Sequence, residues 1–155
     1  MKTVLITGGT RGIGLSTAIK FKQNNWAVYI TSRKQENLDS VLKENPELKG
    51  FVARADDLAA ASETCMKIKD ETGSLDVLIN NAGTNPSGGS LMDVELSAVQ
   101  KTWDVNLMGP LMWTREAVKA GLSESVLNVC SVGGIRPSQY MGAYNISKAG
   151  LIYMT

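Results

Sequence analysis

The chain has 155 residues, and its 16 basic and 15 acidic side chains leave a formal net charge of +1. This length suits one domain with a single hydrophobic core, and the near-neutral balance gives no basic face of the kind that nucleic acid requires. No apolar run approaches the roughly 20 residues that a membrane span needs. We therefore expect neither nucleic acid nor a membrane among the partners of this chain.

The absence of histidine and the scarcity of cysteine narrow the chemistry further. With no histidine in the sequence, nucleophilic sites of the Ser-His-Asp and Cys-His types are excluded, and so is the commonest zinc ligand. Cys65 and Cys130 are too few to form a metal site ligated by several cysteines, so we expect no metal site. The opening MKTVLITGG does not read as a signal peptide, and a reducing, cytoplasmic setting is expected.

Short apolar runs alternate with amphipathic segments along the chain. The runs are unbroken, as is typical of strands covered on both faces of a parallel sheet, and they lie at 4–6, 27–30, 51–53, 77–79 and 126–130. Helices are expected at about 12–24, 35–45, 58–72, 92–120 and 142–155. This alternation predicts a single α/β domain over 1–155, a Rossmann-like, doubly wound parallel sheet of five strands with right-handed crossovers. Residues 86–90 are read as a loop within it.

Four glycines occur within TGGTRGIG, residues 7–14, where the first strand passes into the first helix. Glycine allows a tight turn or a close approach to the backbone, and the amide groups of a helix N-terminus can face an anion. The spacing Gly8-x-x-x-Gly12-x-Gly14 matches neither the G-x-G-x-x-G fingerprint nor a phosphate-binding loop that continues into Gly-Lys-Ser/Thr. By itself, the segment is also compatible with a merely tight connection.

Two residues near the start of the last helix could transfer a proton. Tyr144 and Lys148 are four apart, so their side chains share one helix face, with about 5–6 Å between their Cβ atoms. A lysine cation about 6 Å from the phenol favours the phenolate by roughly 3 kcal/mol at an effective dielectric of about 20. Ser131 follows the run 126–130, which places it at a carboxyl end of the sheet, where ligands bind in open α/β folds. Taken alone, these could be an ordinary helical pair and a serine that begins a turn.

Several motifs together carry a resemblance that none carries alone. Residues 7–14 resemble the T-G-x-x-x-G-x-G motif of the short-chain dehydrogenase/reductase family, and NNAG at 80–83 resembles its motif after the fourth strand. Ser131, thirteen residues before Tyr144, and YNISK at 144–148 resemble the family's catalytic serine and Y-x-x-x-K, while Asn106 matches its helix asparagine. The motifs follow the family's order and spacing. The glycine loop resembles that of the 3-oxoacyl-carrier-protein reductases.

The resemblance implies an oxidoreductase that transfers hydride between a nicotinamide dinucleotide and a ketone or secondary alcohol, with a 3-oxoacyl thioester as one candidate. It implies that Tyr144 is the proton donor in ketone reduction, that Lys148 favours the phenolate and holds the ribose, and that Ser131 holds the substrate oxygen. Asn106 would support a water chain to the lysine. The implied cofactor-binding residues are Gly8, Thr10, Arg11, Gly12, Ile13, Gly14, Ser32, Arg33, Asp57, Leu58, Asn81, Ala82, Gly83, Tyr144 and Lys148.

The end of the second strand bears on the choice of cofactor. NAD-preferring sites place an acid there to bind the ribose 2′-hydroxyl, whereas this chain has TSRK at 31–34. Arg33 can pair with a 2′-phosphate through a charged fork, and Arg11 is placed as in NADP-preferring relatives. We therefore predict NADP(H); the alternative is that these are exposed loop residues. Asp57, the implied adenine contact, carries its own alternative, since an aspartate that opens a helix is an ordinary N-cap.

Members of the family are generally longer than this chain. The resemblance implies that two further strands, a loop over the substrate and a segment that touches the nicotinamide follow Thr155, so substrate identity lies largely outside these residues. A catalytically silent module that binds a nucleotide or a protein is the competing hypothesis.

Apolar side chains on the long helix 92–120 exceed what one sheet-facing stripe needs; they are Trp103, Leu107, Met108, Leu111, Met112 and Trp113. The alternative is that all of them pack on the sheet. In the family, this helix and the Tyr144 helix pair with their copies in a second subunit, which implies a homo-oligomer, a dimer or a tetramer. At the end of the last helix, Leu151, Ile152, Tyr153 and Met154 are expected to lack the partners that later strands would supply, and this chain alone is expected to self-associate or to be poorly soluble.

Overall fold

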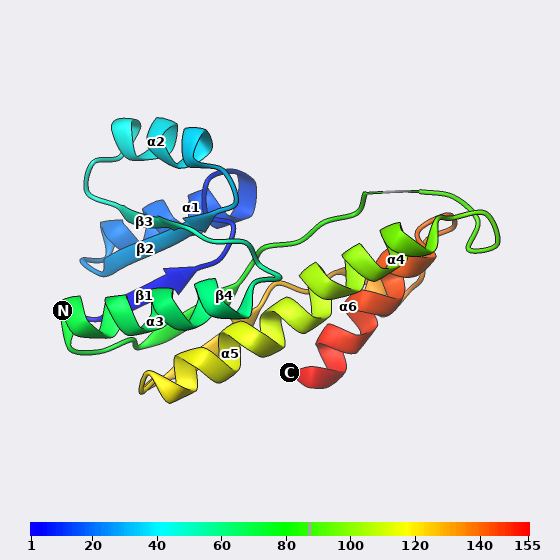
Figure 1. Ribbon diagram of the computed structural model, residues 1–155. Helices are drawn as coiled ribbons and strands as arrows, with labels where there is room; N and C mark the ends of the chain where they lie inside the picture. Colours follow the sequence, from blue (N-terminus) through cyan, green and yellow to red (C-terminus); the bar gives the residue numbers. More distant parts are fainter. Residues whose placement is uncertain (87) are drawn as a thin grey trace.

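The computed structural model describes residues 1–86 and 88–155, and it contains one sheet of five parallel strands in the order β3-β2-β1-β4-β5. The strands are β1 (Thr3–Ile6), β2 (Ala27–Ser32), β3 (Lys49–Val52), β4 (Val77–Asn80) and β5 (Ser125–Asn128). Every neighbouring pair is parallel, and Figure 1 labels β1 to β4. The prediction of a Rossmann-like, doubly wound sheet is confirmed. Ser87, within the predicted loop 86–90, lies outside the described residues.

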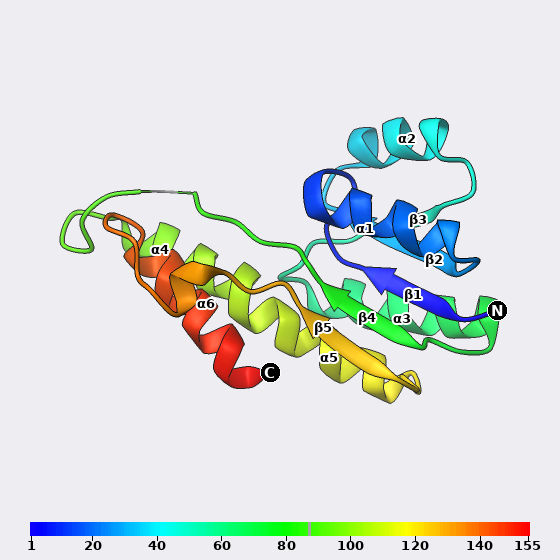
Figure 2. The same cartoon turned by 180° about the vertical axis from the view of Figure 1, so that it is seen from behind.

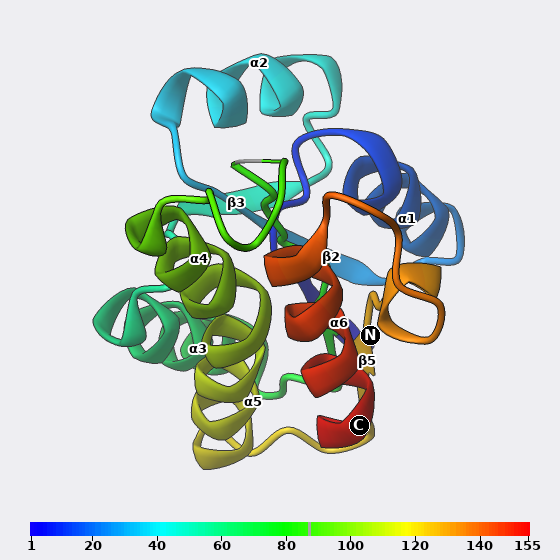
Figure 3. The same ribbon diagram turned by 90° about the vertical axis from the view of Figure 1, so that its right-hand side faces the viewer.

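Helices cover both faces of the sheet. The α-helices are α1 (Gly12–Gln23), α2 (Gln35–Glu44), α3 (Leu58–Thr72), α4 (Leu96–Trp103), α5 (Gly109–Lys119) and α6 (Gly142–Met154). Viewed along the sheet, α1 and α2 lie on one side of it, while α3, α5 and α6 lie on the other (Figure 3). Among the described residues, no helix has the length and apolarity that crossing a bilayer requires.

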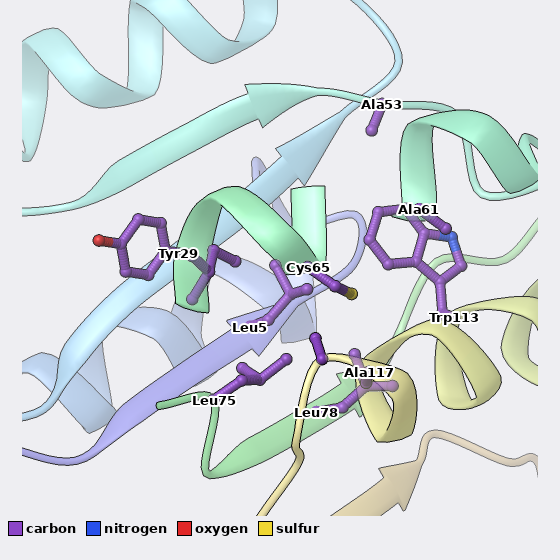
Figure 4. Close-up of a cluster of buried hydrophobic side chains, with 11 residues drawn as sticks. Leu5, Tyr29, Ala53, Ala61, Cys65, Leu75, Leu78, Trp113 and Ala117 are labelled. Carbon is purple, nitrogen blue, oxygen red and sulfur yellow. The ribbon is translucent and has the colours of Figure 1, made fainter. Parts of the chain in front are cut away.

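Successive residues of the central strands pack into two separate cores. Leu5, Tyr29 and Leu78 contribute to a cluster with Trp113 of α5 and Cys65 of α3 (Figure 4). Their neighbours along the strands face the opposite cluster, beneath α1 and α2; they are Val4, Ile6, Val28, Ile30, Val77 and Ile79. Because alternate side chains of a strand point to opposite faces, an unbroken apolar run serves both cores at once.

The edge strands depart from the prediction. The third strand spans Lys49–Val52 rather than 51–53, and the fifth ends at Asn128 rather than at Cys130. Val52 and Leu127 are exposed, so these strands are not covered on both faces as β1 and β4 are. β5 forms the edge of the sheet beyond β4 (Figure 2). Val129 still donates its amide to the Asn80 carbonyl at 2.9 Å, and the chain then turns away toward the following loop.

The predicted helix 92–120 is three consecutive helical segments. It begins only at Leu96, and a π-helix, η1 (Asp104–Met108), separates α4 from α5. Pro110 has no amide to donate to a carbonyl one turn earlier. The amide of the preceding Gly109 donates to the Asp104 carbonyl, five residues back, as in a π-helix. A Cβ on Gly109 would lie 2.6 Å from the Ala55 carbonyl oxygen. The irregular turn therefore brings the helix backbone close to the connection after β3.

α6 packs within the chain against α4, η1 and the short 3₁₀ helix η2 (Val132–Gly134). Leu151 is only 1% exposed, so residues of this chain already bury it. Ile152 and Met154 are half-buried, whereas Tyr153 is 91% exposed. On the long helix, Trp113 is buried in the core and Met108 remains exposed.

One buried carboxylate joins three segments at the amino ends of the strands. Asp76 accepts hydrogen bonds from the Thr3 amide (2.6 Å), the Ser123 hydroxyl (2.7 Å) and the Ser74 hydroxyl (3.1 Å). Burial acts to raise the pKa of Asp76, but these hydrogen bonds prevail and lower it below its usual value. The carboxylate therefore connects β1, β4 and the segment before β5.

We expect Asp76→Asn to lower the free energy of unfolding by about 2–3 kcal/mol, because the amide brings a donor to a site with three donors. Since the pKa of Asp76 is lower in the folded state, its stabilisation is complete above the unfolded value of about 3.9 and is lost as pH falls through the folded value. Urea denaturation at pH 7 and pH 3 measures both effects. Asp70→Asn, on the exposed side of α3, is the control; an equal loss in both variants would contradict the assignment.

Candidate active site

The glycine-rich loop after β1 is tied to the end of β4. The Thr7 hydroxyl accepts hydrogen bonds from the amides of Asn81 (3.0 Å) and Ala82 (3.1 Å). In return, the Asn81 side-chain amide donates to the carbonyls of Thr7 (2.9 Å) and Gly8 (3.0 Å). β1 and β4 are the strands between which the winding reverses direction, and ligands bind at the carboxyl ends of strands at such a point.

Two of the glycines in this loop have different functions. A Cβ on Gly14 would lie 2.5 Å from both the Asn81 side-chain nitrogen and the Gly8 carbonyl oxygen, so the loop packs too tightly for any side chain there. Gly12 has a φ of +54°, and a Cβ on it would meet no atom of the described residues within 4 Å. Gly12 opens α1, whose first amides have no acceptor within the helix. The backbone thus offers an open cradle for an anion.

A cavity of about 520 Å³ lies over these loops. Ten of the predicted cofactor-binding residues line it: Gly8, Thr10, Arg11, Gly12, Ile13, Ser32, Arg33, Asn81, Ala82 and Gly83. The loop and the ends of β2 and β4 therefore converge on one space, as expected for residues at the carboxyl ends of neighbouring parallel strands. Its volume lies within the range of small-molecule and cofactor sites.

Five of the predicted cofactor-binding residues do not line this cavity: Gly14, Asp57, Leu58, Tyr144 and Lys148. Asp57 caps α3, since its side chain accepts the Ala60 amide at 3.0 Å, and Leu58 begins that helix with its side chain half exposed. Gly14 is buried beneath the loop. The structure shows Asp57 as the N-cap of α3, and the adjacent segment 53–56 lines the cavity; the adenine contact of Asp57 stays a prediction.

Ten further residues line the cavity that the sequence motifs do not predict. They are Thr31, Lys34, Asn37, Ala53, Arg54, Ala55, Asp56, Thr84, Lys101 and Val105. Those at strand ends could have been found from their position directly after β2, β3 and β4. Lys101 and Val105 come from α4 and η1, and their approach depends on the packing of the long helix, which gives no local sequence signal.

Positive charge surrounds the cavity. Arg11, Arg33 and Lys34 are exposed at its edge, and Ser32 fixes the turn after β2 by accepting the Lys34 amide at 3.2 Å. Among the described lining residues, Asp56 is the only acid. Burial acts to raise the pKa of Asp56, but hydrogen bonds from Lys101 and Arg54 lower it to about 2, so this carboxylate is ionised at neutral pH.

Tyr144 and Lys148 lie on the first turns of α6, beyond Gly83 from the cavity. The Lys148 ammonium is 5.8 Å from the centre of the Tyr144 ring and donates to the Val129 carbonyl at 2.7 Å. Burial lowers the pKa of Lys148 below its usual value, and the Cys130 thiol acts in the opposite direction. A Cβ on Gly83 would lie 3.8 Å from the Lys148 nitrogen, so the lysine reaches the edge of the cofactor cavity.

Ser131 and Asn106 lie in segments that pack against α6. The Ser131 hydroxyl accepts the Gly133 amide at 3.1 Å at the start of η2, and η2 packs on α6. Asn106 is fully buried in the π-helix; it accepts the Thr84 amide at 2.7 Å and donates to the Thr84 carbonyl and the Ser147 hydroxyl. Its oxygen is 3.5 Å from the position of a Cβ on Gly83. Asn106 thus fixes the segment that follows β4.

Within the described residues, no group of three or more Cys, Asp or Glu side chains is placed to hold a metal ion. The residues present do fit a nicotinamide dinucleotide. The open backbone at Gly12 suits a pyrophosphate, the cations near Arg33 suit a phosphorylated ribose, and the Lys148 nitrogen lies beside Gly83 at the edge of the cavity.

Comparisons with known proteins agree with this geometry. A family model described as short chain dehydrogenase matches residues 2–155. "Dehydrogenase/reductase SDR family member 4" from Homo sapiens is 34% identical over 165 residues, covering 99% of this chain and 58% of that protein. "Tropinone reductase-like 3" from Erythroxylum coca is 28% identical, covering 99% of this chain and 62% of that protein. The chain spans about three fifths of the length of these relatives.

Solved structures show the same fold. ElxO with NADP bound superposes with a TM-score of 0.93 at 30% identity, covering 99% of this chain and 65% of that one. A variant of actinorhodin polyketide ketoreductase with NADPH superposes with a TM-score of 0.94 at 28% identity, covering 99% and 62%. Both of these similar proteins therefore hold a phosphorylated nicotinamide dinucleotide.

We expect Gly12→Ala to weaken NADPH binding at least tenfold, because its methyl group would project into the cradle where the pyrophosphate must approach. Gly73→Ala is a matched control: Gly73 also has a positive φ (+79°) and open space at its Cβ within the described structure, but it caps the far end of α3. Both variants should lose about 1–2 kcal/mol of stability from the left-handed backbone. Titration with NADPH, followed by its fluorescence, gives the affinity of each variant. Similar NADPH affinities in the two variants would contradict the assignment of Gly12 to the pyrophosphate site.

Proposed function

This chain belongs to the short-chain dehydrogenase family, and we propose that it is an NADP-dependent oxidoreductase that interconverts a ketone and a secondary alcohol. The observation that carries the proposal is the junction at Gly83 between a cation-edged dinucleotide cavity and the Tyr144–Lys148 pair. The guanidinium of Arg33 can donate two parallel, charge-assisted hydrogen bonds to a 2′-phosphate.

Tyr144 is the proposed general acid in the direction of ketone reduction. When bound, NADPH supplies the hydride. The Tyr144 hydroxyl donates its proton to the substrate oxygen as negative charge develops there, and the Lys148 cation stabilises the phenolate that remains. Because Tyr144 is only half-buried, the hydroxyl can reach a substrate at the mouth of the site.

Ser131 is proposed to orient the substrate oxygen. Its own oxygen accepts the Gly133 amide, so its hydrogen is left to donate to the substrate. Lys148 uses one of its three donors on the Val129 carbonyl, which leaves two for a cofactor ribose or for water. Asn106, held by Thr84 and Ser147, is proposed to support the water chain to Lys148.

The substrate is proposed to be a small molecule with a carbonyl or hydroxyl group, and a 3-oxoacyl thioester is one candidate. Support comes from the glycine loop and from the similarity to a polyketide ketoreductase. We also propose a homo-oligomer, which the exposed Met108 and Tyr153 support. A cytoplasmic setting is supported by the free thiols of Cys65 and Cys130.

A catalytically silent nucleotide-binding or interaction module is the second candidate. It is favoured by one observation: neither Tyr144 nor Lys148 is among the described residues that line the cavity. NADPH oxidation measured with a panel of ketones distinguishes the two candidates, because only the enzyme consumes NADPH in a ketone-dependent manner.

We expect Tyr144→Phe in the whole protein to abolish ketone-dependent NADPH oxidation while leaving the Kd for NADPH within about twofold, because only the proton donor is removed. Tyr153→Phe, on the same helix and almost fully exposed, should retain full activity. Turnover by Tyr144→Phe at the unmodified rate would exclude the proposed mechanism.

We expect NADPH to bind at least tenfold more tightly than NADH, a difference of about 1.4 kcal/mol. Arg33→Ala should remove most of this gap without weakening NADH binding, because the guanidinium interacts with the 2′-phosphate that NADH lacks. Arg115→Ala, an exposed arginine on α5, is the control. Equal affinities for the two dinucleotides in the unmodified protein would show that the cofactor assignment is wrong.

A further inference from the structure

Three charged side chains form a chain of ion pairs in the wall of the cofactor cavity. Arg54 contacts Asp56 through two hydrogen bonds, from Nε to Oδ1 at 3.2 Å and from Nη2 to Oδ2 at 3.1 Å. The Lys101 ammonium binds the same Oδ2 from the other side, at 2.5 Å. All three residues line the cavity. We refer to them as the Asp56 cluster.

The cluster neutralises the carboxylate more completely than an ordinary surface pair would. The Asp56 side chain is 16% exposed, whereas those of Arg54 and Lys101 are 57% and 38% exposed. The carboxylate is therefore covered by its two cations, and solvent screens it poorly. Its two oxygens accept three hydrogen bonds, all from charged donors, which are the stronger kind.

This arrangement matters because Asp56 is the only acid among the described residues that line a cavity otherwise edged by Arg11, Arg33 and Lys34. An uncovered carboxylate there would oppose the attraction that these cations exert on an anionic ligand. The opposition would be greater for a ligand with a 2′-phosphate, which carries nearly two extra charges, than for one with a 2′-hydroxyl.

We infer that Lys101 and Arg54 are specificity-determining residues, which cover Asp56 and so allow the cavity to select a 2′-phosphorylated dinucleotide. The inference rests on the proposed NADP-dependent function and adds residues from the connection after β3 and from α4 to a preference otherwise assigned to Arg33 and Arg11. These residues act by cancelling a repulsion, without touching the phosphate themselves.

A purely structural function is the alternative. Lys101 lies on α4, and Asp56 lies in the connection between β3 and α3, so their ion pair also joins two walls of the cavity. Trp113 and Gly109 join the same walls at Ala55, through a hydrogen bond of 3.1 Å and a close backbone contact. If the ion pair only joined the two walls, its loss would alter the Kd for NADPH and for NADH alike. Charge cancellation predicts that its loss alters the ratio of these two Kd values.

The test measures Kd for NADPH and for NADH in the unmodified protein, in Lys101→Gln, in Asp56→Asn and in the double variant. The ratio of the two Kd values isolates the 2′-phosphate, because the pyrophosphate is common to both ligands. We expect Lys101→Gln to reduce the preference for NADPH about threefold and the double variant to restore it. Lys119→Gln, which removes a cation that pairs with Glu116 away from the cavity, should leave the ratio unchanged.

Two results would overturn the inference: an unchanged ratio in Lys101→Gln, or an equal reduction when Asp56 is already asparagine. The second would mean that Lys101 acts on the phosphate directly. Thermal unfolding of each variant identifies a loss of fold, which affects both ligands together. The proposed function has its own test: it fails if the unmodified protein binds NADH as tightly as NADPH. The inference is judged by how each substitution changes the ratio of the two Kd values, and this change can be measured whatever the ratio is in the unmodified protein.

Discussion

The hydrogen bonds between Thr7 and Asn81 are the interaction on which the rest of the site depends. The winding of the sheet reverses between β1 and β4, and each strand ends with polar groups that would be costly to leave unpaired. Thr7 and Asn81 satisfy one another through side chain and backbone in both directions. The glycine loop is therefore held over the end of β4 before any ligand is present, and its amides do not have to be ordered on binding.

The second determinant is the close approach of the long helix to the connection after β3. Gly109 and Trp113 both meet Ala55, and Lys101 meets Asp56 one residue later. The π-helix between α4 and α5 makes this approach compatible with the position of Asn106, which holds the segment after β4 through Thr84. One irregular helix thereby positions two walls of the cavity, and local departures of this kind often occur at functional sites.

Most of the sheet and the local motifs could be predicted from the sequence, because their signals are local. Unbroken apolar runs predicted β1, β2 and β4 closely, since those strands face a core on both sides; they misplaced the ends of β3 and β5, which are half-exposed. Of two adjacent aspartates, the motif resemblance predicts Asp57 as a cofactor contact, while Asp56 lines the cavity. Which of the two side chains faces the cavity depends on the residue at which α3 begins. Lys101 escaped prediction because its contact spans 45 residues along the chain.

The anchoring of Asp76 divides the molecule by function. The carboxylate joins β1, β4 and the segment before β5 at the amino ends of the strands, while every residue assigned to cofactor or substrate comes from their carboxyl ends or from the helices beyond. Mutations that reshape the ligand-binding loops therefore leave the interactions at Asp76 intact. In evolutionary terms, the fold can diversify its specificity at one end of the sheet while stability is conserved at the other, so selection on the two properties acts on largely separate sets of positions.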